Sequence, residues 1–149
     1  MKRQAFTLIE LLITISIAGI LLIVGVPAMH DFVMSNRATA EVNNIVSALQ
    51  FARSEAIKND VTVKFCKKGN WRDGQIVETI HGKILRVFPA LPKGDKLQWD
   101  SSLGQNDCVK FSALGLTNGQ RGTFYYYPQG EQKDVKKIII NATGRIRYE

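Results

Sequence analysis

Two arginines near the end of the sequence have the spacing of a pair that contacts phosphates. Arg145 and Arg147 follow Gly144 and flank Ile146. In an extended strand successive side chains alternate between faces, so the two guanidinium groups project together, roughly 7 Å apart, while Ile146 turns toward the core. Gly144 permits a turn or a close approach before the strand. Because guanidinium groups bind phosphates through paired hydrogen bonds, we expect the two arginines to contact adjacent phosphates of a nucleic acid.

Further residues could extend this basic surface. Tyr148 follows the pair and could lie alongside a sugar or a base, and the other candidate cations are Lys133, Lys136, Lys137, Arg121, Lys93 and Lys96. The formal net charge of +7 favours anionic partners such as nucleic acid or lipid head groups, although it also serves solubility. A second interpretation of Arg145 and Arg147 is that they are solvated residues of an edge strand, where charge discourages aggregation.

No pattern of residues indicates catalysis or metal binding. The sequence holds no phosphate-binding glycine loop, no Gly-x-Ser-x-Gly elbow and no cluster of His, Asp or Glu at metal-ligand spacing. The two histidines, His30 and His81, lie far apart in the sequence, and His81 precedes a glycine in a predicted turn. We therefore expect no enzyme activity, no cofactor and no metal.

A single acidic residue interrupts the apolar segment that follows the basic N-terminus. Residues 5–27 form an apolar run of roughly twenty residues, long enough to span a bilayer as a helix, and Glu10 lies near its start. A carboxylate at membrane depth is costly, and no Lys or Arg lies within one helical turn of it, so its expected partner is an amino group made by cutting the chain just upstream. Two alternatives remain, a secretory signal peptide cleaved near residues 26–28 and a simple single-span anchor held by Lys2 and Arg3.

Cys66 and Cys108 are the only cysteines. The positive-inside rule places the region after the apolar segment outside the cytoplasm, where such a pair usually forms a disulfide. This bridge closes a loop of about forty residues and contributes about 4 kcal/mol in the chain-entropy model. Neither cysteine has a second Cys or a His at ligand spacing, so a zinc site is disfavoured.

The spacing of apolar residues predicts a helix that carries the apolar segment into a folded domain. From residue 28 to about residue 58 they recur at i, i+3 and i+4, at Val42, Ile45, Val46, Leu49, Ala52 and Ala56. Pro27 removes one backbone donor and predicts a kink or a loosened turn at the end of the apolar run. We therefore expect one long helix with a transmembrane half and an amphipathic half.

After residue 60 the pattern changes to short runs rich in Val, Ile, Thr and aromatic residues. These runs predict strands at residues 61–66, 75–80, 83–88, 96–99, 109–112, 123–127, 135–141 and 145–148. Residues 69–74 predict a turn, and His81-Gly82 predicts the turn of the neighbouring hairpin. Trp71 either packs over that hairpin, which we favour, or is exposed on its turn as a binding aromatic. Closely spaced strands imply antiparallel pairing, so the expected fold class is α+β, with the long helix packed on antiparallel β-sheets.

The N-terminal segment resembles the processing site of type IV prepilins and type II secretion pseudopilins. The matching residues are Ala-Phe-Thr-Leu-Ile-Glu after a short basic leader, with Ala5 where the family usually has Gly. The resemblance implies that a membrane-embedded peptidase cuts between Ala5 and Phe6 and methylates the new N-terminus at Phe6. It also implies that Glu10, fifth in the mature chain, pairs with the N-terminal amine of a neighbouring subunit during assembly.

The rest of the chain is similar to the GspH/FimT group of minor pilins and pseudopilins. The similarity rests on residues 47–66, the later Gly-Thr-Phe-Tyr-Tyr-Tyr-Pro run and Gly-Arg-Ile-Arg at residues 144–147. It implies a leader at residues 1–5, a transmembrane and assembly helix at 6–28, and a periplasmic pilin-like domain at 29–149, helical to about residue 58 and built of β-sheets over 61–149. It also implies a single-pass inner-membrane protein that reaches the cell surface when it joins a pilus.

The Gly-Arg-x-Arg element looks like the C-terminal element of FimT proteins, which bind DNA for uptake in natural transformation. By this resemblance the expected partners are double-stranded DNA, other major and minor pilins, the prepilin peptidase, and the inner membrane before assembly. Binding would be largely independent of base sequence, because phosphate contacts carry no direct sequence information. The alternative is a structural minor pilin or GspH-like pseudopilin that primes filament assembly without binding DNA.

Overall fold

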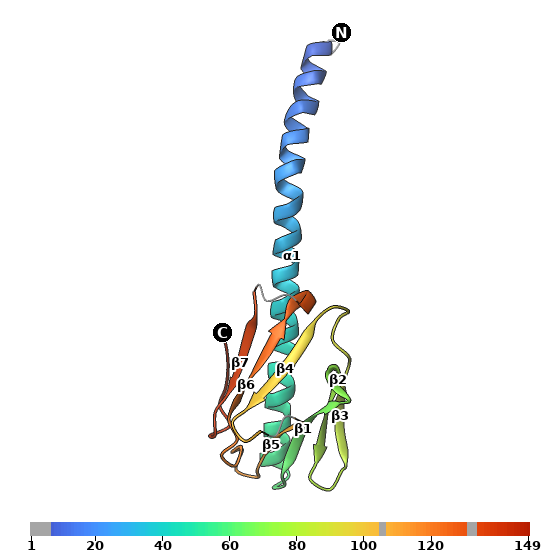
Figure 1. Cartoon of the computed structure of the whole chain (residues 1–149). Helices are drawn as coiled ribbons and strands as arrows, with labels where there is room; N and C mark the ends of the chain where they lie inside the picture. The colour runs from blue at the N-terminus through green and yellow to red at the C-terminus, as the bar shows by residue number, and fades with distance from the viewer. Residues whose placement is uncertain (1–6, 105–106, 131–133) are drawn as a thin grey trace. The chain divides into compact units, whose positions relative to one another are not determined.

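The computed structural model describes residues 7–104, 107–130 and 134–149. It contains two compact units, of which the first ends at Asn36 and the second spans Arg37 to Glu149. Helix α1 (Leu8–Lys58) supplies the first unit and begins the second, and eight strands complete the second (Figure 1). The sequence predictions for Ala5, Phe6 and Lys133 lie outside the described residues.

The described part of the first unit is a helix with exposed apolar side chains. Thr7 begins it, because its Oγ1 accepts the N–H of Glu10 at 3.3 Å and its carbonyl accepts the N–H of Leu11 at 3.2 Å. The helix continues through Pro27, so the loss of one N–H donor does not end it. By length and composition this segment can cross a membrane, and none of its most apolar window is buried.

In the second unit α1 buries one stripe of small and aliphatic side chains. The buried residues are Ala38, Val42, Ile45, Ala48, Leu49, Ala52 and Ala56, and Val46 is partly buried beside them. The predicted amphipathic stripe is therefore confirmed. Small residues at three of the last four buried positions let the helix backbone approach the strands closely.

The strands form two antiparallel sheets, as the sequence predicts. The first sheet has the order β3-β2-β1-β5, with β1 (Val63–Lys68), β2 (Asn70–Thr79), β3 (Ile84–Phe88) and β5 (Cys108–Phe111). The second has the order β4-β6-β7-β8, with β4 (Lys96–Ser101), β6 (Gly122–Tyr127), β7 (Lys136–Ile140) and β8 (Ile146–Tyr148). A short 3-10 turn, η1 (Pro128–Gly130), follows β6. The α+β prediction is confirmed.

The predicted turn at residues 69–74 is wrong in extent. Strand β2 already begins at Asn70, so Trp71 to Gly74 belong to the strand rather than to the turn. The chain reverses at Gly69, whose φ of +82° is in the left-handed region that glycine adopts readily, after a register shift between Lys67 and Lys68. The hairpin between β2 and β3 is as predicted, with the N–H of Gly82 donating to the carbonyl of Thr79 at 3.0 Å.

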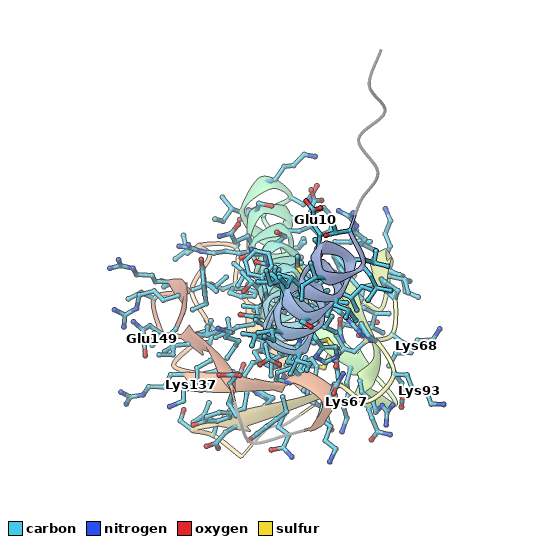
Figure 2. All side chains as sticks on the ribbon, turned by 90° about the horizontal axis from the view of Figure 1, so that it is seen from above. Glu10, Lys67, Lys68, Lys93, Lys137 and Glu149 are labelled. Atoms are coloured by element: carbon cyan, nitrogen blue, oxygen red, sulfur yellow. A yellow bond between two sulfur atoms is a disulfide. The ribbon has the colours of Figure 1, made fainter. Side chains whose placement is uncertain are left out.

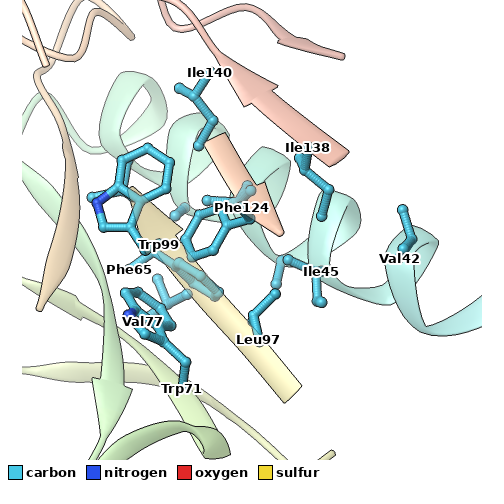
Figure 3. Packing of buried hydrophobic residues seen from close by; sticks show 14 of the residues in the cluster. Val42, Ile45, Phe65, Trp71, Val77, Leu97, Trp99, Phe124, Ile138 and Ile140 are labelled. Atoms are coloured by element: carbon cyan, nitrogen blue, oxygen red, sulfur yellow. The ribbon is translucent and has the colours of Figure 1, made fainter. Parts of the chain in front are cut away.

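Aromatic side chains from both sheets fill the core together with the buried stripe of α1 (Figure 3). The ring centroid of Trp71 lies 5.6 Å from that of Phe65 and 4.9 Å from that of Phe124. On the other side of Phe124, the ring of Trp99 lies 4.4 Å away. Trp71 is 7% exposed, so the interpretation of this residue as a packing residue is confirmed. This cluster ties the first sheet to the second and fixes the strands that carry the basic residues.

A disulfide joins the strands β1 and β5. Cys66 and Cys108 are direct cross-strand partners, and their sulfur atoms lie 2.08 Å apart. The predicted pairing is therefore confirmed.

Candidate nucleic-acid interface

The two predicted arginines lie on the last hairpin of the second sheet. Strands β7 and β8 are joined by a tight turn in which the N–H of Gly144 donates to the carbonyl of Asn141 at 2.8 Å. The N–H of Asn141 in turn donates to the carbonyl of Arg145 at 3.1 Å. Among the residues that the structure describes, strand β8 lies at the edge of its sheet and pairs with β7 alone.

Arg145 and Arg147 are both exposed, whereas Ile146 between them is partly buried and packs against the core. Arg147 is paired with Ile139 of β7, and Ile146 with the buried Ile140. Alternation along the strand therefore directs both guanidinium groups away from the core, roughly 7 Å apart by strand rise. Neither arginine has an ion-pair partner among the residues that the structure describes.

Gly144 holds this hairpin against the rest of the domain. The residue is buried, and its φ of +73° lies in the left-handed region. A Cβ at this position would overlap the carbonyl oxygen of Gly115 and would lie 3.1 Å from Nε of Arg53. The glycine of the Gly-Arg-x-Arg element is therefore required by the packing of two loops.

Arg53, near the end of α1, fastens the same two loops. Its Nε donates to the carbonyl oxygen of Gly115 at 3.0 Å, and its terminal nitrogen lies 3.5 Å from the carbonyl oxygen of Thr143. Sequence spacing contains no signal of this contact, because Gly115 lies 62 positions away from Arg53. Arg53 therefore positions the turn that precedes Arg145.

Thr117 provides a third attachment for the turn. Its N–H donates to the carbonyl of Ala142 at 3.1 Å, and its hydroxyl lies 3.2 Å from the carbonyl oxygen of Asn141. The residue is only 1% exposed, so water does not compete for these contacts. The turn before the arginines is thus held from α1 and from the loop that precedes β6.

The sheet separates the predicted lysines. Lys137 pairs with Tyr125 across β6 and β7, and its Nζ lies 6.0 Å from the centroid of the tyrosine ring. Ile139 is the cross-strand partner of Arg147, and Lys137 lies two positions from Ile139 on β7. Lys137 therefore occupies the same face of the sheet as Arg147. Lys136 shares the opposite face with the buried Ile138. The structure therefore brings Lys137, but not Lys136, to the arginine face.

Arg121 lies at the same end of the sheet as Arg145. Its carbonyl accepts the N–H of Ser102 at 2.8 Å, which continues the ladder beyond Gly122. Extending the register of β6 and β7 by one pair places Arg121 opposite Asn141, which neighbours Arg145 on β8. Two strand spacings separate the arginines, about 10 Å between backbones. Arg121, Arg145 and Arg147 thus form the basic end of this face.

Two residues near the end of β8 modify the expected surface. Tyr148 pairs with the buried Ile138 and lies on the face opposite to Arg147, so it does not share the arginine face, and its place alongside a sugar or a base stays a prediction. Glu149 exchanges two backbone hydrogen bonds of 2.8 Å with Lys137, and Figure 2 shows both residues on one side of the second unit. Its carboxylate adds one negative charge close to the arginine face.

A buried carboxyl group lies elsewhere in the domain. Asp95, only 2% exposed, accepts the hydroxyl hydrogen of Tyr126 at 2.6 Å and the N–H of Gln129 at 2.9 Å. A guanidinium nitrogen of Arg37 lies 3.7 Å from the same carboxyl group. Burial, reinforced by Asp95, raises the pKa of the Tyr126 phenol well above its usual value. These contacts are all internal and fasten the loop before β4 to α1 and β6.

Within the described ranges, no group of three His, Cys, Asp or Glu side chains is close enough to hold a metal ion. Glu10, the residue predicted to act in assembly, is exposed on the first turn of α1.

Two family models match the sequence. A model described as the type II transport protein GspH matches residues 41–144, and a model of the prokaryotic N-terminal methylation motif matches residues 1–26. No curated protein sequence matches the chain.

Crystal structures of the type IV minor pilin FimU of Pseudomonas aeruginosa share the fold. One crystal form has a TM-score of 0.65 at 22% sequence identity and covers 79% of this chain and 92% of that chain. A second form has a TM-score of 0.58 at 23% identity and covers 75% and 90%. The helix on two antiparallel sheets is thus the type IV pilin fold.

Proposed function

The chain belongs to the GspH family of type II transport proteins, and we propose that it is a minor pilin of a type IV pilus that binds extracellular double-stranded DNA for uptake in natural transformation. Its role is binding and assembly rather than catalysis. The observation that carries the DNA proposal is the exposed Arg145 and Arg147 pair, which lacks ion-pair partners in the described part of the chain and is held on a rigid hairpin.

The arrangement of the basic face supports phosphate recognition. Arg121, Arg145, Arg147 and Lys137 share one face of the second sheet, and the turn before β8 is fixed by Arg53. Because the backbone of the turn is already fixed, phosphate binding has to order only the arginine side chains, whereas a pair on a mobile loop would also lose backbone entropy. Contacts of this kind depend on charge and not on base identity, so binding extends to any duplex sequence.

The N-terminal half supports the assembly part of the proposal. In it, the leader at residues 1–5 is removed by the prepilin peptidase between Ala5 and Phe6, and Phe6 becomes methylated. Residues 6–28 then anchor the subunit in the inner membrane with residues 29–149 in the periplasm, until Glu10 engages the N-terminus of a neighbouring pilin. The methylation motif at residues 1–26 and the exposed apolar helix support this sequence of events.

A duplex-binding titration tests the DNA proposal. The full-length chain in detergent micelles is titrated against random-sequence duplex, and the wild type is compared with Arg145→Gln/Arg147→Gln. We expect an affinity at least about tenfold lower, because charge-assisted hydrogen bonds are lost. The slope of log affinity against log salt should also decrease by about two, one for each lost phosphate contact.

A matched control removes the same charge elsewhere. Lys58→Gln/Lys83→Gln deletes two cations from the end of α1 and the β2–β3 turn, and we expect its affinity to stay close to that of the wild type. If both double variants lost the same amount of duplex affinity, net charge alone would explain the effect. If the wild type and the arginine variant bound the duplex with equal affinity, Arg145 and Arg147 would not form the DNA-binding site.

One observation favours the alternative, a structural minor pilin or GspH-like pseudopilin that primes assembly without DNA. The packing of the turn before β8 fully explains why residue 144 is a glycine and why residue 53 is an arginine. A salt-insensitive or absent interaction with duplex, together with normal filament assembly, would support this alternative.

A further inference from the structure

A groove lies between the β1–β2 hairpin and the outer face of the second sheet. Its volume is about 590 Å³, and its lining residues come from the β1–β2 hairpin, β4 and β6, including the core residues Trp71, Leu97 and Trp99. The residues that line it include Lys67, Arg72, Lys96, Gln98, Tyr125 and Tyr127. The groove is therefore both aromatic and basic, a combination that neither the arginine pair nor the core requires.

Two tyrosines form an aromatic row along the groove. Tyr125 and Tyr127 are two positions apart on β6 and alternate with the buried Phe124 and Tyr126, so they share the outer face. Both are partly exposed. Strand rise separates their side chains by roughly 7 Å, about twice the 3.4 Å between stacked bases of one strand in a duplex. This spacing fits the bases of a stretched single strand.

A cation accompanies each tyrosine. Lys96 is the cross-strand partner of Tyr127 on β4, and Lys137 is the partner of Tyr125 on β7. Lys96 is exposed and lies on the groove side of the row. Phosphates that follow two stacked bases would therefore meet a positive charge beside each ring.

The opposite wall of the groove is basic as well. Arg72 is exposed and has no ion-pair partner in the described ranges, whereas Nζ of Lys67 lies 2.7 Å from a carboxylate oxygen of Asp107. Figure 2 shows Lys67, Lys68 and Lys93 projecting from one side of the domain. Three cations and one carboxylate, Asp100, line the groove, so its net charge favours an anionic ligand.

We propose that this groove binds single-stranded nucleic acid, with bases stacked on Tyr125 and Tyr127 and phosphates held by Lys96 and Arg72. A duplex keeps its bases inside the stack, so it can use the cations but not the aromatic faces. The groove and the arginine pair lie on the same face of the second sheet and share Lys137, but only the groove offers tyrosine rings for stacking. It gives the subunit a means to hold a frayed or single-stranded end.

Stacking variants test the groove directly. Fluorescein-labelled oligothymidylate and oligouridylate of about twelve nucleotides, within the usual site size, are titrated by anisotropy against the full-length chain in detergent micelles. Tyr125→Ala and Tyr127→Ala should each weaken binding about tenfold, because each removes one stacking platform. Tyr125→Phe and Tyr127→Phe keep the ring and should bind as the wild type does.

Two further measurements make the test independent of folding and of the duplex site. Each alanine variant should keep the thermal unfolding midpoint of its phenylalanine counterpart, and Tyr127→Ala should also keep its duplex affinity. Arg145→Gln/Arg147→Gln should weaken oligonucleotide binding less than the alanine variants do, since its lost charges lie outside the groove lining. If the alanine variants bind both oligonucleotides more weakly, the groove accepts DNA and RNA alike. If they bind only one of the two more weakly, that polymer is the ligand.

Three results would overturn the proposal. Alanine variants that bind both oligomers as tightly as the wild type would exclude stacking on the tyrosines. Phenylalanine variants as weak as the alanine variants would assign recognition to the hydroxyl groups. An equal loss of heparin binding in the alanine variants would make the groove a site for acidic polysaccharide rather than for nucleic acid.

Discussion

Within the Gly-Arg-x-Arg element, Gly144 is the structural part and the two arginines are the part that faces solvent. Its backbone lies against Gly115, and a side chain there has no space. The two arginines that follow are exposed. The motif therefore combines one residue that fixes a turn with two that face solvent, and variants of the glycine report on the fold rather than on phosphate contact.

We expect Gly144→Ala to lower the free energy of unfolding by about 2–4 kcal/mol, because alanine is strained in the left-handed region and its Cβ overlaps the Gly115 carbonyl. Gly82→Ala is the matched control. Gly82 also has a positive φ, +83°, but its Cβ would meet nothing within 4 Å, so only the conformational cost of about 1 kcal/mol remains. Urea unfolding of the full-length chain measures both. A Gly144→Ala cost no larger than that of Gly82→Ala would contradict the packing explanation.

At the scale of elements, a buried network joins α1, the loop before β4, strand β6 and η1. Asp95 accepts hydrogen bonds from Tyr126 and Gln129 and lies beside Arg37 of the helix. The Tyr126 phenol is fully buried, and its pKa is raised, chiefly by burial and then by Asp95. The network therefore links the stability of these elements to pH in the alkaline range.

The sign of this linkage follows from the proton that Tyr126 keeps. Below about pH 10, the usual tyrosine pKa, Tyr126 keeps its phenolic proton in both the folded and the unfolded chain. Its contribution to the free energy of unfolding is then fully present. Above this pH the unfolded chain loses the proton while folded Tyr126 retains it, so the free energy of unfolding should fall by about 1.4 kcal/mol per pH unit from this residue. Tyr126→Phe should abolish this component and cost about 1.5–3 kcal/mol at neutral pH.

Urea unfolding between about pH 8 and pH 11.5, a range that brackets the usual tyrosine pKa, checks this expectation. Tyr148→Phe, which removes an exposed phenol, is the control and should keep the alkaline slope of the wild type. Equal slopes in the wild type and Tyr126→Phe would show that the buried phenol does not carry the effect.

Local patterns predicted most elements, and contacts between distant segments explain what they missed. The helical stripe and the alternation around Ile146 follow from periods that any short window contains. The extent of β2 was missed because Trp71 to Gly74 read as turn residues, while the burial of Trp71 against Phe65 and Phe124 favours strand. The contacts of Arg53 join α1 to two distant loops, and the tyrosine groove is lined by strands that lie far apart in the sequence, so neither follows from local spacing.

For the whole molecule, the charge at Glu10 sets a requirement on what surrounds the apolar helix. The carboxylate lies in the first turn of α1, where the helix dipole already favours negative charge, and no ion pair of Glu10 occurs in the described part of the chain. An apolar surface of this length needs lipid or other helices around it, and a carboxylate within it needs a cation in either setting.

We expect Glu10→Gln to leave membrane insertion intact, because removing the charge lowers the cost of burial, but to decrease incorporation into filaments by about tenfold if one buried ion pair is lost. Immunoblots of the membrane fraction and of sheared filaments measure the two steps separately. Asp31→Asn is the control, since it removes an exposed carboxylate from the same helix beyond the apolar run and should assemble normally. If the Glu10→Gln variant enters filaments normally, the carboxylate serves only its own helix. If the variant protein is missing from the membrane fraction, the carboxylate acts at a step before assembly.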